Sequence, residues 1–162
     1  MKHHETIILN NLTTGYGHKI VSEGLYASLR SRELTCLLGP NGAGKSTLLR
    51  TLCGFIASLD GTVEVEGKNV SALSPSELSR KVAVVLTERT QISNLTARRM
   101  VELGRAPYTG FWGRIGAEDR GIVGESLELM GVGMLADRMI DELSDGERQK
   151  IMIAKALAQS TP

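Results

Sequence analysis

The clearest chemical pattern of the chain is a run of nine residues, Gly39-Pro40-Asn41-Gly42-Ala43-Gly44-Lys45-Ser46-Thr47, called here the phosphate loop. It fits G-x-x-x-x-G-K-[ST], in which glycines let successive backbone N–H groups point at one anion. Lys45 can reach the β- and γ-phosphates of a nucleoside triphosphate, and the Ser46 hydroxyl can complete the shell of a Mg²⁺ ion. The pattern predicts that all nine residues contact the nucleotide, with Lys45 as the catalytic group and Ser46 as the metal ligand.

The segments on either side of the phosphate loop fit this interpretation. Residues 33–38 form a short apolar run that predicts a buried strand, and Leu48, Leu49, Leu52 and Phe55 recur at helical spacing. Strand, loop and helix in this order are the context that the motif requires. The alternative, a chance match in a glycine-containing turn, does not account for both flanks.

Composition limits the class of protein. The 162 residues are 41% hydrophobic and 23% charged, as in a soluble globular domain, and 19 basic residues nearly cancel 18 acidic ones. This balance gives no reason to expect nucleic acid or a membrane surface as a direct partner. The longest apolar run, Val82–Leu86, is too short to span a bilayer, and residues 1–9 do not look like a signal peptide. We therefore expect any membrane attachment to come through another protein.

The rest of the chain reads as a strand-rich part followed by a helical part. Residues 61–67 alternate between turn glycines and predict an antiparallel strand, whereas 82–86 predict a buried strand. Ser74-Pro75-Ser76-Glu77 and Ser144-Asp145-Gly146-Glu147 are capping boxes that predict helix starts, and a third helix is expected to begin at Thr96.

A loop between these helices carries three aromatic residues, Tyr108, Phe111 and Trp112. We expect them to seal a small satellite core, although an exposed cluster would instead be a partner surface.

The second capping box makes a family recognisable. Leu143-Ser144-Asp145-Gly146-Glu147, called here the signature segment, resembles the Leu-Ser-Gly-Gly-Gln signature of ABC-type ATPases. By itself it could be an ordinary capped helix, but a helix N-terminus with a capping serine can also hold phosphate. Together with the preceding phosphate loop, the combination is highly specific.

The resemblance implies the α/β fold of an ABC-type P-loop NTPase, with a mixed or parallel sheet core, an antiparallel β part and a helical subdomain. Residues 1–87 would form the ATP-binding core, 88–147 the helical subdomain and 148–162 a return helix to the core. In such a family two subunits sandwich two ATP molecules with Mg²⁺, and Ser144, Gly146 and Glu147 would serve the nucleotide of the second copy. Tyr16 matches the aromatic residue that stacks on adenine, the alternative being a structural tyrosine in a turn.

The kind of ABC protein is suggested by residues 102–108, which look like the Leu-Gly-Arg-x-Pro segment of importer ATPases for iron–siderophore, haem or cobalamin. This resemblance implies a dimeric ATPase on the cytoplasmic face of the cell membrane, bound to multi-span permease subunits. The alternatives are a soluble ABC ATPase acting on DNA, iron–sulphur assembly or ribosomes, and an interaction module without catalysis. No sustained heptads of a DNA-repair coiled coil occur in the chain.

Three departures from the family pattern affect these expectations. Thr87 stands where the family has a glutamine, for which Glu88 or Gln91 could substitute. Asp145 and Glu147 replace glycine and glutamine, and carboxylates beside a triphosphate are unfavourable unless they face away or meet a cation. The family's apolar strand with its Asp-Glu pair, and its switch histidine, do not occur in the sequence. We therefore expect a fragment, incomplete at its C-terminal end, that binds nucleotide without turning it over.

Overall fold

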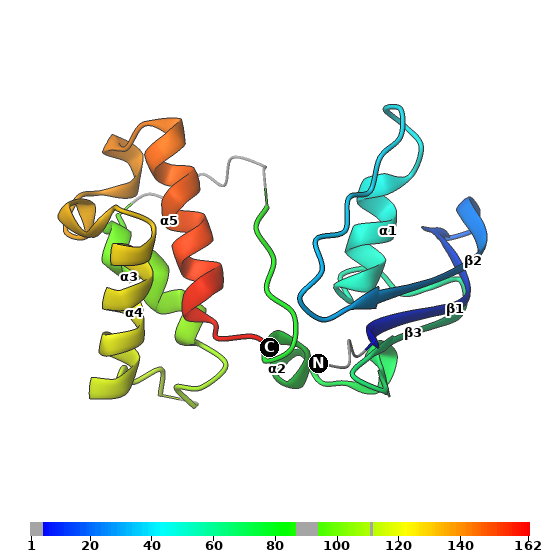
Figure 1. Cartoon of the computed structure of the whole chain (residues 1–162), viewed down its shortest axis with the longest axis horizontal. Coiled ribbons are helices and arrows are strands. Elements are labelled where there is room, and N and C mark those ends of the chain that lie inside the picture. The colour runs from blue at the N-terminus through cyan, green and yellow to red at the C-terminus, as the bar shows by residue number, and fades with distance from the viewer. Residues whose placement is uncertain (1–4, 87–93, 111) are drawn as a thin grey trace. The chain divides into compact units, whose positions relative to one another are not determined.

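The structure is a computed structural model that describes residues 5–86, 94–110 and 112–162. The chain divides into two compact units, Met1–Leu78 and Ser79–Pro162 (Figure 1). The first unit contains a sheet, the helix α1 (Lys45–Leu52) and shorter helical segments, and the second unit contains a group of helices. Each unit is described separately below.

The sheet of the first unit is antiparallel and has the strand order β2-β1-β3-β4. Its strands are β1 (Glu5–Tyr16), β2 (Lys19–Arg30), β3 (Asp60–Val65) and β4 (Lys68–Asn69). Val63 and Val65 of β3 are buried, as their alternation with exposed positions predicts. The predicted antiparallel β part is therefore confirmed.

The helices of the first unit follow local sequence signals. Helix α1 (Lys45–Leu52) begins at the phosphate loop and lies against β1. The 3-10 helix η1 (Val70–Ala72) leads to α2 (Pro75–Ser79), whose last residue is already the first of the second unit. Ser74 donates its backbone N–H and its hydroxyl to Glu77 Oε2 at 2.9 and 2.7 Å, so the capping box predicted at α2 is confirmed.

The second unit is a helical domain. Its elements are α3 (Ala97–Glu102), η2 (Leu103–Arg105), α4 (Ala117–Leu129), η3 (Gly133–Leu135), η4 (Ile140–Glu142) and α5 (Asp145–Ala158). Helices α3, α4 and α5 share one apolar core, in which Met100, Val123 and Ile151 are almost fully buried. Thr96 caps α3, where its hydroxyl oxygen accepts the Arg99 N–H at 3.3 Å. These helices confirm the helical part expected of the fold class, whereas the predicted bounds, 88–147 for the helical subdomain and 148–162 for a return helix to the core, stay predictions.

Two predicted strands are wrong. Residues 33–38 and 82–86 adopt no regular structure, and Leu34 and Leu38 are 94% and 87% exposed. A strand needs a neighbouring strand to pair its backbone N–H and C=O groups, and no strand of the described sheet pairs with either segment. The described residues therefore contain the antiparallel part of the predicted sheet and none of its parallel part.

The aromatic loop fits neither expectation as a whole. Tyr108 packs under a guanidinium group, whereas Trp112 is 80% exposed and seals no core. Phe111 lies outside the described residues. Among the helices that the structure describes, none has the length and apolarity needed to cross a bilayer.

Candidate nucleotide-binding site

The phosphate loop folds around the end of its own lysine side chain. Lys45 Nζ donates hydrogen bonds to the carbonyl oxygens of Gly39 and Pro40, at 2.8 and 2.7 Å. The Ala43 N–H donates to the same Pro40 carbonyl at 3.3 Å, which closes the turn. An ammonium group has three donors, so these two bonds leave one for an anion. The loop thus holds a positive charge in place before any ligand arrives.

The glycines of the loop have conformations and neighbours that other residues tolerate poorly. Gly42 and Gly44 have φ values of 84° and 88°. A Cβ atom on Gly44 would lie 2.6 Å from Val21 Cγ1 and 3.1 Å from Ser22 Oγ, because β2 runs directly beside the loop. Gly44 is also the N-cap of α1, and no side chain caps the helix there. The first N–H groups of α1 are therefore not blocked by a capping side chain and can face an anion.

The two hydroxyl residues after Lys45 lie in different surroundings. Ser46 is exposed on the first turn of α1, whereas Thr47 is buried. Only the Ser46 hydroxyl is therefore open to an incoming cation. Contact between Thr47 and a ligand stays a prediction.

Tyr16 ends β1 beside the phosphate-loop helix. Its phenol oxygen accepts a hydrogen bond from Arg50 Nη1 at 3.5 Å. Hydrogen bonds with the Thr47 and Arg50 side chains lower the pKa of the phenol. The residue is 47% exposed, so part of its ring remains available for stacking. The structure thus brings Tyr16 and the helix that begins at Lys45 together. Sequence reasoning missed Arg50, because no local pattern links it to a residue 34 positions away.

The signature segment forms the predicted cap of α5. Ser144 donates its backbone N–H and its hydroxyl to Glu147 Oε2, at 2.9 and 2.7 Å, and its hydroxyl oxygen accepts the Glu147 N–H at 3.4 Å. These bonds lower the pKa of the Glu147 carboxyl. The carboxylate at this position is therefore turned back onto the start of its own helix. Around Gly146, no described atom lies within 4 Å of where a Cβ would stand, so packing within the chain does not require a glycine there.

The candidate site residues fall in different units of the chain. Tyr16 and the phosphate loop belong to the first unit, and the signature segment belongs to the second. Their pairing across a dimer stays a prediction. Thr87, Glu88 and Gln91, the candidates for the glutamine position, lie outside the described residues.

A family model described as ABC transporter matches residues 23–162. The chain belongs to the ABC transporter family. This match includes both the phosphate loop and the signature segment. The predicted family is therefore confirmed, and the two motifs are elements of one ATPase fold.

Curated relatives add detail. An ABC transporter ATP-binding protein of Methanocaldococcus jannaschii is 45% identical and aligns with 92% of this chain and 51% of its own length. The iron(3+)-hydroxamate import ATP-binding protein of Bacillus subtilis is 37% identical, with coverages of 94% and 59%. The cobalamin import ATP-binding protein of Halobacterium salinarum is 41% identical, with coverages of 88% and 35%. The chain thus spans between about a third and three-fifths of the length of these relatives.

Solved structures agree on the fold. A nucleotide-free ATP-binding cassette from an ABC transporter superposes with a TM-score of 0.83 at 24% identity, covering 98% of this chain and 66% of that one. An ABC transporter in an inward-facing conformation superposes with a TM-score of 0.79 at 25% identity, with coverages of 96% and 56%. The ABC-type ATPase fold is therefore shown.

Proposed function

We propose that this chain is the ATP-binding part of the ATPase subunit of a membrane importer for a metal chelate such as an iron–siderophore complex, haem or cobalamin. The observation that carries ATP binding is the phosphate loop, in which Lys45 Nζ is fixed on two carbonyls beside a helix start without a side-chain cap. The importer class is supported by relatives named for iron(3+)-hydroxamate and cobalamin import.

The chain's own groups suit the binding of a triphosphate. The third donor of Lys45 and the first N–H groups of α1 would bind the β- and γ-phosphates. The half-exposed Tyr16 ring would stack on the adenine. The exposed Ser46 hydroxyl would be the protein ligand of Mg²⁺, which, when bound, neutralises phosphate charge. Lys45 and the loop amides would then stabilise the charge that develops during phosphoryl transfer.

Turnover would require a second copy of the subunit. We propose that Ser144 and Gly146 of one copy face the nucleotide held by the phosphate loop of the other, and that Glu147 fixes the Ser144 hydroxyl. ATP binding would close the dimer on the cytoplasmic side of the membrane, and hydrolysis would reopen it. This cycle would drive alternating access in the permease subunits. Residues 1–162 contain no run of four apolar residues followed by an acidic pair, so we expect them to bind nucleotide without hydrolysing it.

Calorimetry with Mg-ATP on the protein at its natural length tests nucleotide binding. Lys45→Ala should weaken binding at least tenfold and abolish turnover, because it removes the fixed charge. Lys68→Ala is the matched control, since Lys68 is exposed on β4. Absence of heat with wild-type protein, or normal binding by Lys45→Ala, would contradict the proposal.

A second comparison tests the signature segment. Ser74 and Ser144 make the same capping bonds, so each change to alanine should cost about 1 kcal/mol of helix stability. Only Ser144→Ala should also reduce turnover, by at least tenfold. Equal turnover of the two variants would show that Ser144 is merely a cap.

Purification of the protein with its natural partners tests the importer class. Recovery with a multi-span membrane protein is the expected result. Recovery with ribosomes or DNA would favour a soluble ABC ATPase instead.

A further inference from the structure

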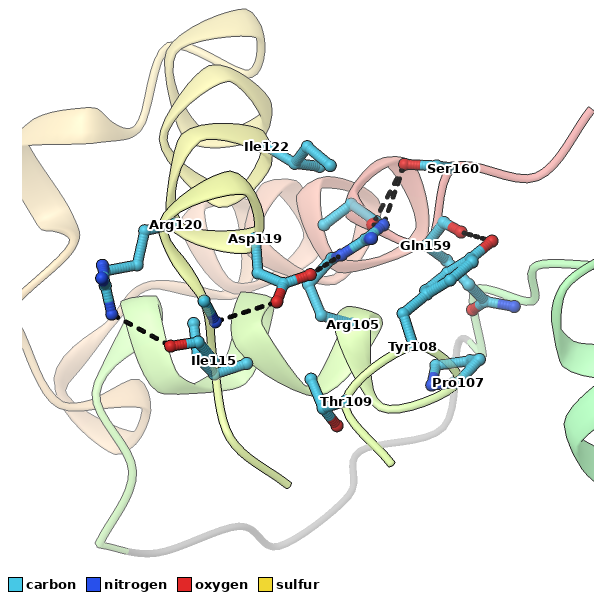
Figure 2. Close-up of polar contacts among 12 residues, drawn as sticks. Arg105, Pro107, Tyr108, Thr109, Ile115, Asp119, Arg120, Ile122, Gln159 and Ser160 are labelled. Atoms are coloured by element: carbon cyan, nitrogen blue, oxygen red, sulfur yellow. Dashed lines mark hydrogen bonds and ion pairs between the residues drawn. The ribbon is translucent and has the colours of Figure 1, made fainter. Parts of the chain in front are cut away.

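The C-terminal end of α5 is held by Arg105, Tyr108 and Gln159, which are called here the joint (Figure 2). Arg105 is only 6% exposed, and its Nη1 donates to the carbonyl oxygen of Ala158 at 2.8 Å. Its Nε donates to Asp119 Oδ1 at 2.9 Å, on the first turn of α4. The guanidinium carbon lies 4.1 Å from the centre of the Tyr108 ring. One buried cation thus links η2, α4 and the last residue of α5.

Gln159 connects this cluster to a distant part of the chain. Its backbone carbonyl accepts the Tyr108 hydroxyl at 3.0 Å, as Figure 2 shows. Its side-chain Nε2 donates to the carbonyl oxygens of Ser79 and Val82, the second at 2.9 Å. Ser79 is the first residue of the second unit. The amide therefore attaches the end of α5 to the backbone through which the chain enters the helical unit.

We propose that Gln159 is a positioning residue. Through the joint it fixes the direction of α5, and hence the place of Ser144 at the opposite end of that helix, relative to the entering segment Ser79–Val82. The proposal rests on the proposed function, in which Ser144 serves the nucleotide of a second copy.

Because α5 is long, a small tilt of the helix at the joint produces a large displacement of Ser144 at its other end. The helix has 14 residues, which corresponds to a length of about 21 Å. A tilt of about 5° around its C-terminal end would move its N-terminal end by about 2 Å. Misplacement of reacting groups by about 1 Å can lower a rate about 100-fold. Losing the amide should therefore affect turnover far more than nucleotide binding at the phosphate loop.

The packing of α5 separates this role from general stability. Ile151, Ala154 and Ala158 are fully buried against α3, α4 and their connections, so the helix has an apolar anchor of its own. Gly104 lies so close to the end of α5 that a Cβ there would collide with the Lys155 carbonyl oxygen. The Gln159 amide adds no apolar burial to this core. It reaches instead to the Ser79 and Val82 carbonyls, while Arg80 of the same segment donates to the Pro107 carbonyl beside Tyr108. Loss of the amide should therefore loosen the direction of the helix and leave the core in place.

The test uses the protein at its natural length, with Gln159→Glu as the main variant. Glutamate has the same shape but places an acceptor oxygen where Nε2 donates to two carbonyls. Gln159→Lys restores a donor and should rescue. Tyr108→Phe removes the hydroxyl that holds the Gln159 carbonyl, and Tyr26→Phe is its matched control, because Tyr26 is 71% exposed on β2.

Three measurements follow for each variant: the Kd for Mg-ATP, the turnover rate, and hydrogen exchange of residues 79–86 without nucleotide. Gln159→Glu should keep its Kd within twofold, lose at least tenfold in turnover and exchange at least tenfold faster at 79–86. Gln159→Lys should keep at least half of the wild-type turnover, and Tyr26→Phe should match the wild type. The turnover of Tyr108→Phe should lie between those of Gln159→Glu and Gln159→Lys.

Turnover of Gln159→Glu within twofold of wild type, or a parallel loss of nucleotide affinity and turnover, would overturn the positioning role. A wild-type protein that binds no Mg-ATP would overturn the proposed function instead. Hydrogen exchange would still test whether the Gln159 amide attaches the entering segment to α5. Unchanged exchange rates at 79–86 in Gln159→Glu would refute this attachment, and a tenfold increase would support it.

Discussion

The glycines of the phosphate loop offer a matched pair of substitutions, Gly42→Ala and Gly44→Ala. Both positions have positive φ, which costs an L-residue about 1–2 kcal/mol. Around Gly42, no described atom lies within 4 Å of the place that a Cβ would take, whereas a Cβ on Gly44 would lie 2.6 Å from Val21 Cγ1. Such overpacking adds about 1–3 kcal/mol. Gly44→Ala should therefore lower the free energy of unfolding by about 2–5 kcal/mol in total, and Gly42→Ala by about 1–2 kcal/mol.

Urea denaturation of the nucleotide-free protein measures both costs. In a Val21→Ala background, where the colliding methyl is gone, the extra cost of Gly44→Ala should shrink by at least about 1 kcal/mol, a coupling typical of residues in contact. Equal costs for Gly42→Ala and Gly44→Ala, or additivity with Val21→Ala, would refute the inference that β2 presses on the loop.

The remaining predictions concern the helical unit. Arg105→Met should destabilise it by about 1–3 kcal/mol in urea denaturation, because the Asp119 carboxylate and the Ala158 carbonyl both lose a charged hydrogen-bond donor, and Arg105→Met with Asp119→Leu should recover part of that loss. Bonds from the Gly116 N–H and the Arg105 guanidinium lower the pKa of Asp119. The contribution of the Asp119 carboxylate to stability is therefore complete above about pH 4 and is lost as the pH falls through the folded pKa. The Tm of Asp119→Asn should accordingly decrease less than the wild-type Tm as the pH is lowered below about 4. Gly104→Ala should lower Tm, since the new methyl collides with backbone, whereas Gly124→Ala, in open space on α4, should raise stability by about 0.5–1 kcal/mol in the same assay.

Features that depend on neighbouring residues could be predicted from the sequence. The capping boxes at Ser74 and Ser144 form between residues three positions apart, so their donors and acceptors stand together in the sequence. The antiparallel strand β3 could be predicted for a similar reason, because its alternating residues report the buried face directly.

Features that depend on distant partners could not be predicted. Residues 33–38 have the composition of a buried strand, but a strand forms only where another strand pairs with it, and the described sheet supplies none there. Arg105 and Ala158 are 53 positions apart, and Gln159 and Val82 are 77 apart. Leu-Gly-Arg marks the family resemblance, but neither a period nor a spacing indicates that this arginine closes the end of α5.

The Lys45 ammonium and the Ser144 hydroxyl, which are both proposed to face phosphates, already donate hydrogen bonds within their own chain. They differ in how many donors remain for a ligand. Lys45 gives two donors to the loop carbonyls and keeps a third, so phosphate can bind without breaking either bond. Ser144 has a single hydroxyl donor, and Glu147 Oε2 accepts it at 2.7 Å. A phosphate that accepts this donor must break that bond, and the exchange of one hydrogen bond for another yields little net free energy. Nucleotide affinity should therefore be set at the phosphate loop, whereas engagement of the signature segment should be the weak step that the position of α5 controls.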